Sequence, residues 1–172
     1  VRRQRQMCIR DRFYDEWYPD FRWGALTTLS NSIGQGEILV TPIQLANMMA
    51  AVANKGYYFT PHIIKSISGD SIDRRFRKKN EVKIDKKYFN QIELGLLNVY
   101  KTGTAKLLKV NNIEICGKSG TVENFTKIKG KKTQLTDHSI FVAYAPKDKP
   151  KIAISVLVEN GHYGSKWAGM IA

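Results

Sequence analysis

One short run constrains this chain more than any other: Gly-Lys-Ser-Gly-Thr at positions 117–121, inside a predicted β-strand. A glycine in mid-strand usually marks a place where another backbone or a ligand comes close. Alternation along a strand puts Lys118 and Gly120 on one face, and Ser119 and Thr121 on the other. Lysine and hydroxyl groups beside such a glycine favour a strand edge that binds an extended substrate carrying a carboxylate. The alternative is an ordinary exposed strand with a bulge glycine.

Two long helices are predicted before this strand. The first begins at Pro42 behind a Thr41–Gln44 capping box and stops at Gly56. Its core-facing residues recur at helical spacing and are Leu45, Met48, Met49 and Val52. The second begins after Asp85 and ends near 102–103. Its predicted apolar stripe is Phe89, Ile92, Leu96 and Val99.

The remaining pattern predicts a sheet. The motif strand is expected over 113–122, and the clearest hairpin has strands at 139–145 and 151–159. Both faces of the last strand are largely apolar, so helices should cover this antiparallel sheet on both sides. Other segments are expected to form a loop leading into a helix (13–36), an extended run (57–67), polar or basic loops (68–79 and 124–137) and a final helix capped by Ser165. The predicted class is α+β.

Composition bounds the domain organisation. The chain has 172 residues, of which 42% are hydrophobic, enough for one domain with a core. No apolar stretch reaches the roughly 18 residues that span a bilayer. The cysteines, Cys8 and Cys116, make no disulfide framework, and no zinc spacing exists. Cys116, on the motif strand, is expected to be a small buried hydrophobe. No metal or cofactor is expected.

The net charge of +13 raises the question of an acidic partner. Residues 1–12 hold five arginines and one aspartate, and we expect them to be a non-native basic arm preceding a domain at 13–172. A genuine arm that binds an acidic surface is the alternative. Two further basic runs, 74–79 and 127–132, are expected to be solvated loops rather than nucleic-acid contacts, because few aromatics accompany them. Attraction to anionic lipid head groups is a possible minor role for them.

The run 118–120 matches the K-[ST]-G element of the penicillin-binding proteins and serine β-lactamases. Flanking segments resemble the penicillin-binding transpeptidases in the same order: 32–37 (SIGQGE), 40–48 (VTPIQLANM), 54–63, 137–146 and 158–161. The resemblance covers 13–172 and is greatest to the elongation-type subgroup, penicillin-binding protein 2. It implies part of a β-lactamase/transpeptidase-like fold. No serine here has a lysine three residues later or an asparagine two residues later, so the segment that carries the catalytic serine is expected to be missing. The chain also ends at 167–172, where the family begins a final helix, so the fold is expected to be truncated at both ends.

The resemblance also implies a function. In the family, a serine acyl-enzyme cross-links peptidoglycan stem peptides at their D-Ala-D-Ala ends, and β-lactams trap that serine. The whole protein is therefore expected to be a D,D-transpeptidase that binds penicillin. It is expected to face the periplasm from the bacterial inner membrane, through an anchor absent from this chain, and to work with the cell-wall elongation machinery. Without the Ser-x-x-Lys nucleophile, this chain alone is expected to be inactive.

The family pattern carries roles to five residues. Lys118 is implied as the catalytic residue that tunes proton transfer and attracts the substrate carboxylate, which Thr121 would hydrogen-bond. Gly120 would let the substrate lie along the strand, and Val122 would give an oxyanion-hole N–H. Ser119 belongs to the substrate-binding set, although a buried structural hydroxyl is its simpler interpretation. Alternation alone does not place Thr121 beside Lys118, so a local twist at Gly120 would be needed.

Other interpretations stay open. They are a serine β-lactamase-like hydrolase, a non-catalytic module that binds β-lactams or cell-wall peptides and, remotely, a basic nucleic-acid-binding protein. His138 is expected to satisfy a local hydrogen bond. A few further residues are candidates for the border of a cleft: Glu123, Asn124, His162, Tyr163 and Lys166.

Overall fold

The computed structural model describes residues 24–35, 39–67, 71–108, 110, 112–129 and 131–172, in two compact units, 1–39 and 40–172. In the first unit the described residues form helix α2 (Ala25–Ser32), so the loop expected before a helix is itself partly helical. The sequence signal was weak because Gly24 at the cap position has no side chain to mark a helix start. The predicted basic arm, 1–12, lies outside the described residues.

The second unit holds the remaining elements. Its helices are α3 (Pro42–Ala53), α4 (Arg74–Arg77), α5 (Lys86–Lys101), the 3-10 turn η1 (Lys106–Leu108) and α6 (Ala168–Ile171). Its strands are β1 (Tyr57–Tyr58), β2 (Asn80–Glu81), β3 (Cys116–Val122), β4 (Phe125–Ile128), β5 (Lys131–Gln134), β6 (His138–Ala145) and β7 (Ile152–Val158). Among the described residues, no helix has the length and apolar character needed to cross a membrane.

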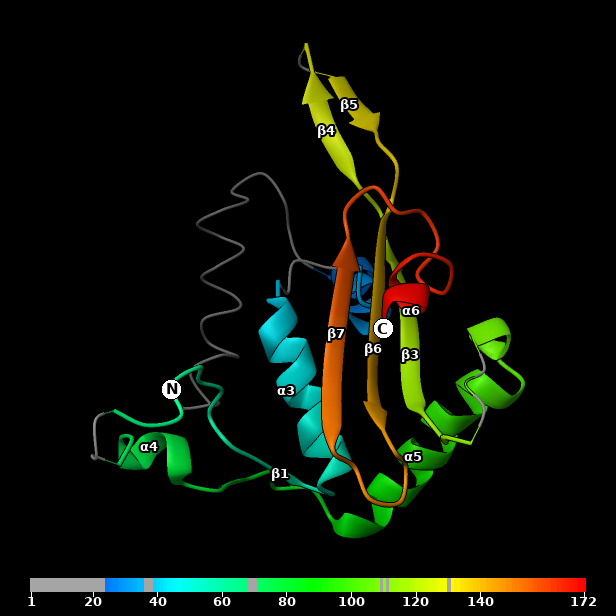
Figure 1. Ribbon diagram of the computed structural model, residues 1–172. Coiled ribbons are helices and arrows are strands. Elements are labelled where there is room, and N and C mark those ends of the chain that lie inside the picture. The colour runs from blue at the N-terminus through cyan, green and yellow to red at the C-terminus, as the bar shows by residue number, and fades with distance from the viewer. Residues whose placement is uncertain (1–23, 36–38, 68–70, 109, 111, 130) are drawn as a thin grey trace. The chain divides into compact units, whose positions relative to one another are not determined.

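The central sheet has three antiparallel strands in the order β3-β6-β7 (Figure 1). The register runs without interruption along β3, where Gly120 faces Ile140 and Thr121 faces Ser139. The predicted hairpin of β6 and β7 is confirmed, with Ser139 opposite Val158. The unbroken register means that Gly120 is not a bulge glycine.

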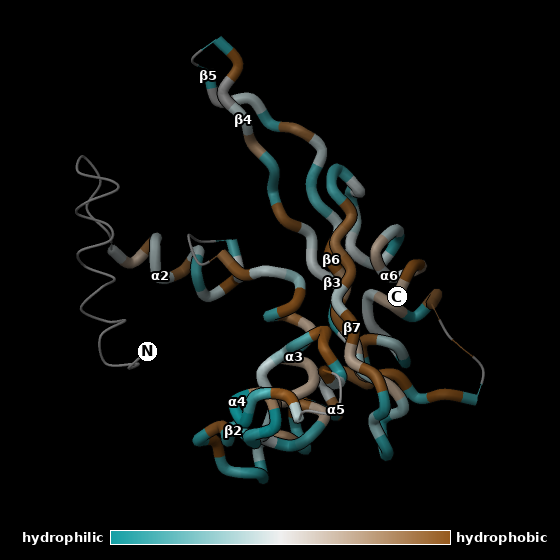
Figure 2. The backbone as a smooth tube through the Cα atoms, turned by 60° about the vertical axis from the view of Figure 1, so that its left-hand side comes forward, coloured by the Kyte–Doolittle hydropathy of each residue, from teal (hydrophilic) through white to brown (hydrophobic). Residues whose placement is uncertain are grey.

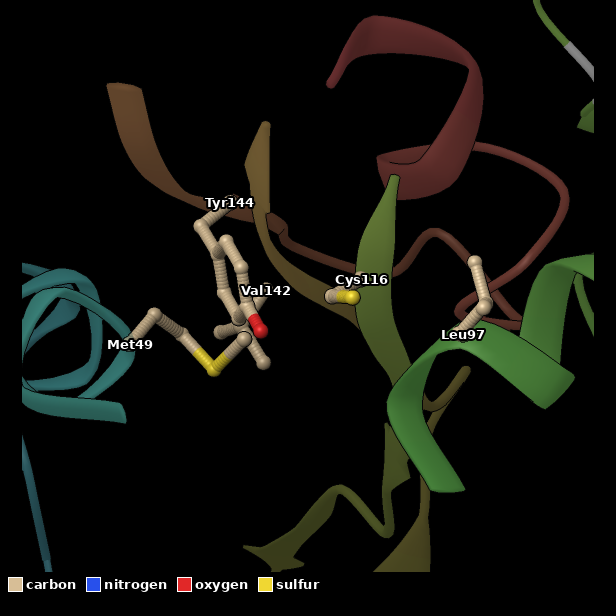
Figure 3. Close-up of a cluster of buried hydrophobic side chains, with 5 residues drawn as sticks. All are labelled: Met49, Leu97, Cys116, Val142 and Tyr144. Atoms are coloured by element: carbon tan, nitrogen blue, oxygen red, sulfur yellow. The ribbon is translucent and has the colours of Figure 1, made fainter. Parts of the chain in front are cut away.

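One face of the sheet packs on α3, and we call it the α3 face. Its buried cluster joins α3 and α5 to β3 and β6, and its members are Met49, Leu97, Cys116, Val142 and Tyr144 (Figure 3). Cys116 is fully buried, as predicted, and burial raises the pKa of its thiol. Thr41 caps α3 through the predicted capping box with Gln44. Met48 was expected in this core but is exposed, because Met49 is the α3 methionine that faces the sheet.

The opposite face packs on α6, η1 and the end of α5, and we call it the α6 face. Its buried cluster is Tyr100, Ala105, Phe141, Ala143 and Ala168. The ring of Tyr100 meets that of Phe141 edge to face at 5.8 Å, and burial raises the pKa of Tyr100 to about 12. Both faces are therefore covered by helices, as predicted. Figure 2 shows the apolar character of β6 and β7 along most of their length.

Four further local predictions were wrong. Ser165 does not cap the final helix, because α6 begins at Ala168 behind Trp167 and has no side-chain cap. Residues 124–137 are not a loop but contain the β4–β5 hairpin, in which Phe125 faces Gln134. Its lysines resemble loop composition, and the alternation within each four-residue strand is too short to stand out. Within 68–79 lies α4, capped by Asp73, and the chain then returns as β2 to pair with β1. On α5 the predicted core residue Ile92 is exposed, because Leu97 and Tyr100 face inward together with the correctly predicted Phe89.

Candidate functional site

The motif residues lie on the outermost strand of the central sheet. β3 pairs with β6 on one side, and no strand in the described part of the chain pairs with its other side. We call this other side the outer edge of β3. An outer edge presents main-chain N–H and C=O groups that can pair with an extended peptide.

The direction of those main-chain groups follows from Gly120. A Cβ placed on Gly164, which lies against β3, would touch the carbonyl oxygens of both Gly120 and Ile140. The carbonyl oxygens of two paired residues on neighbouring antiparallel strands lie close together only when both carbonyls point into the space between the two strands. Gly120 therefore points its N–H and C=O toward β6. Because alternate residues point in opposite directions, Ser119 and Thr121 direct theirs to the outer edge.

Lys118 supplies a positive charge at this edge. Its register partner is Val142, so its side chain lies on the α3 face, and the residue is exposed. The ammonium donates a hydrogen bond to the carbonyl oxygen of Ser119. That carbonyl is directed to the outer edge, so the bond holds the charge beside the main-chain groups that would meet a substrate.

Ser119 points the other way and is half-buried on the α6 face. Its hydroxyl lies 2.8 Å from that of Thr104, in the turn between α5 and η1. This contact fits the structural role that the sequence suggested for Ser119. Thr104 was not predicted as a neighbour of the motif, because nothing local in the sequence connects residues 15 positions apart.

Gly120 is a glycine that the surrounding packing does not require. A Cβ there would meet only the Cβ of Ile140, at 3.7 Å, an ordinary contact. Its φ is not in the left-handed region, which favours glycine and which Gly34 and Gly56 adopt. By contrast, a Cβ on Gly117 would lie 2.9 Å from the carbonyl oxygen of Val142. The space above Gly120 on the α3 face is therefore available for a ligand.

Thr121 and Val122 are placed differently from the expectation. The Thr121 hydroxyl lies on the α6 face and accepts a hydrogen bond from the N–H of Gly164 at 3.3 Å, and the regular register keeps it on the face opposite to that of Lys118. Val122 has the same parity as Gly120, so its N–H points toward β6. The expectation of a Val122 oxyanion donor does not fit this geometry. The N–H directed to the outer edge at this end of β3 is that of Thr121.

The other candidates separate into two groups. His138 accepts a hydrogen bond from the N–H of Asn160 at 3.1 Å, which confirms its predicted local role. Asn124 is also structural, because its amide donates to the side-chain oxygen of Asn160 at 3.0 Å. His162 borders a shallow hollow of about 500 Å³ formed with residues 134–137, and none of the motif residues lines it. Among the described residues, no group of three His, Cys, Asp or Glu is placed to hold a metal ion.

Comparison with known sequences identifies the family. The model of the penicillin binding protein transpeptidase domain matches residues 12–172. A peptidoglycan D,D-transpeptidase MrdA of Acinetobacter baumannii is 34% identical over 163 residues, which cover 86% of this chain and 23% of that protein. The MrdA of Haemophilus influenzae is 33% identical over 165 residues, covering 87% of this chain and 25% of that protein. The chain thus spans about a quarter of the length of these relatives.

Solved structures agree with this result. The structure of Pseudomonas aeruginosa PBP2 in complex with WCK 5153 superposes with a TM-score of 0.74 and 32% identity, over 94% of this chain and 34% of that one. The Helicobacter pylori PBP2 in a complex with MreC gives a TM-score of 0.70 and 27% identity, over 92% and 28% of the two chains. The α+β fold, as part of a larger transpeptidase-type domain, is confirmed by these matches.

Proposed function

The chain belongs to the family of penicillin-binding protein transpeptidase domains, and we propose that it supplies one wall of the active site of a peptidoglycan D,D-transpeptidase. In this proposal the acylating serine and its partner lysine come from another segment of the whole protein. The shared family, and the D,D-transpeptidase activity named for its relatives, support the reaction class.

We assign the substrate to the outer edge of β3. A stem peptide ending in D-Ala-D-Ala would lie antiparallel to residues 118–121, and its terminal carboxylate would be attracted by the Lys118 ammonium. Ser119 would offer its carbonyl, and Thr121 its N–H, to the peptide backbone or to the developing oxyanion. Penicillin and other β-lactams would occupy the same edge. This places the oxyanion donor at Thr121 instead of Val122.

The observation that carries the proposal is the open space at Gly120. Neither backbone strain nor packing within the described residues accounts for a glycine there. A glycine in mid-strand costs stability relative to a residue with a side chain, so its presence needs another cause. A ligand that lies across the α3 face of β3, next to the Lys118 ammonium, supplies that cause.

The test is covalent labelling of the full-length protein by a fluorescent penicillin. We expect wild-type protein to be labelled on a serine outside residues 1–172, and Lys118→Ala to lose at least about a hundredfold in acylation rate. Slow release of the label would distinguish a transpeptidase from a β-lactamase-like hydrolase. The 172-residue chain alone should stay unlabelled. An unlabelled full-length protein, or a label on Ser119, would contradict the proposal.

We also propose a cellular setting, from the relatives alone. The similar Helicobacter pylori PBP2 was solved in a complex with MreC, so we propose an MreC-type protein of the elongation machinery as a partner. Membrane anchoring with the domain in the periplasm is part of the same proposal. Co-purification of the full-length protein with its own MreC homologue from membranes would support both, and recovery in the cytoplasmic fraction without it would oppose both.

A further inference from the structure

The loop between β7 and α6, residues 159–167, lies on β3 at the motif. We call it the brace loop. At its centre Gly164 sits directly over the pair formed by Gly120 and Ile140, so close that a Cβ there would collide with both carbonyl oxygens and would lie 2.8 Å from the nitrogen of Gly120. Only a residue without a side chain can occupy this position.

Hydrogen bonds fix this contact at the end of β3. The N–H of Gly164 donates to the Thr121 hydroxyl at 3.3 Å. Ser139, which faces Thr121 across the ladder and is fully buried, donates its hydroxyl to the carbonyl of Tyr163 and accepts from the N–H of Ala168, both at 3.0 Å. The two hydroxyls on neighbouring strands thus hold both sides of Gly164.

The first half of the brace loop is held in conformations that are uncommon for residues with a side chain, although Asn and His adopt them more readily than most. Asn160 has φ +54° and His162 has φ +56°, in the left-handed region. Their N–H groups bond to groups on or just before β6, namely the His138 ring and the carbonyl of Asp137. Such conformations persist only where surrounding contacts determine them. The loop is therefore a fixed part of the sheet's surroundings.

We propose that the brace loop is a positioning device for the substrate edge and that Gly164 is its key positioning residue. By holding the Thr121 side chain on the α6 face, it fixes the direction of the Thr121 N–H at the outer edge. Hydrogen bonds to a developing oxyanion depend steeply on donor position, and a displacement of about 1 Å can cost on the order of a hundredfold in rate. This inference rests on the proposed function.

The test compares brace variants in the full-length protein. Gly164→Ala should push the loop off β3, and Ser139→Ala should remove two of its hydrogen bonds without adding a clash. Gly95→Ala is the matched control, because a Cβ at this exposed helical position meets nothing within 4 Å. Acylation by penicillin is measured as a function of concentration, well below each variant's melting temperature.

We expect the limiting acylation rate at saturating penicillin to fall at least about tenfold in Gly164→Ala. The rate should fall by a smaller factor in Ser139→Ala. If Gly164→Ala fails to fold, the rate of Ser139→Ala alone tests the inference. The affinity of the non-covalent complex should change little, because the donor acts mainly in the transition state. Wild-type rates in folded brace variants, or a loss confined to affinity, would overturn the inference. Absence of labelling in the wild-type protein would instead overturn the proposed function.

Discussion

Gly117 and Gly120 lie three positions apart on the same strand and have different reasons to be glycine. Gly117 is enclosed: besides the Val142 carbonyl, a Cβ there would meet Ala143 and Tyr100 at 3.1 Å. Gly120 has room for a methyl group. The first glycine therefore serves the packing of α5 on β3, whereas the second leaves space outside the core.

A stability measurement can separate these two reasons. Gly117→Ala should lower the free energy of unfolding by about 1–3 kcal/mol, because the added methyl overpacks a buried site. Urea titration of the full-length protein measures this, with Gly95→Ala as the control that has open space. A Gly117→Ala variant as stable as the control would show that the strand yields to the methyl group at no cost.

At the scale of elements, an ion-pair cluster ties the end of α5 to the turn after β6. Glu114 contacts Lys101, the last residue of α5, at 3.0 Å and Lys147 at 3.7 Å. The hydrogen bond from Lys101, followed by the positive charge of both lysines, lowers the pKa of the Glu114 carboxyl below its ordinary 4.5. Lys147 also donates a hydrogen bond to the Asp148 carboxylate, and this bond raises the pKa of the Lys147 ammonium.

This cluster predicts a pH-dependent contribution to stability. A carboxyl whose pKa is lower in the folded state stabilises the fold above its unfolded pKa and loses that effect as pH falls through the folded pKa. Glu114→Gln should therefore lower the melting temperature slightly at neutral pH. The difference from wild type should vanish once the pH is well below 4.5. A difference that is constant with pH would mean that the charge of Glu114 contributes nothing.

The elements that the sequence predicted correctly have strong local signals. The capping box of α3, the Asp85 cap of α5 and the nearly continuous apolar runs of β6 and β7 each specify an element within a few residues. The site was predictable only in part. The roles of Lys118 and Gly120 follow from the motif, but the contacts that orient the motif strand do not. The contact of Thr104 with Ser119 and that of Gly164 with Gly120 join residues far apart in the chain. Their geometry depends on how the elements pack.

At the scale of the whole molecule, large apolar side chains are exposed on two helices. On α6, Met170 and Ile171 are 70% and 64% exposed, and Trp167 beside them is about half exposed. On α3, Ile43 and Met48 are also exposed. Clusters of this kind on a soluble protein usually mark surfaces that contact another chain or another part of the same protein.

We therefore predict that the 172-residue chain alone folds poorly. It should bind a dye that reports exposed apolar surface, and its thermal unfolding should be broad, whereas the full-length protein should bind less dye per molecule and melt more sharply. Calorimetry and dye fluorescence measure this. A sharp, cooperative transition of the isolated chain without dye binding would show that it is stable without further segments.

The central claim is that the outer edge of β3 binds the substrate, and the most direct measurement is the acylation rate of Gly120→Ala in the full-length protein. The methyl group fits the described packing and alanine is the better strand residue, so the melting temperature should equal or exceed that of wild type. It would occupy the space assigned to the ligand, so the second-order rate of penicillin acylation should fall at least about tenfold. Wild-type acylation in a Gly120→Ala protein of unchanged stability would contradict the account.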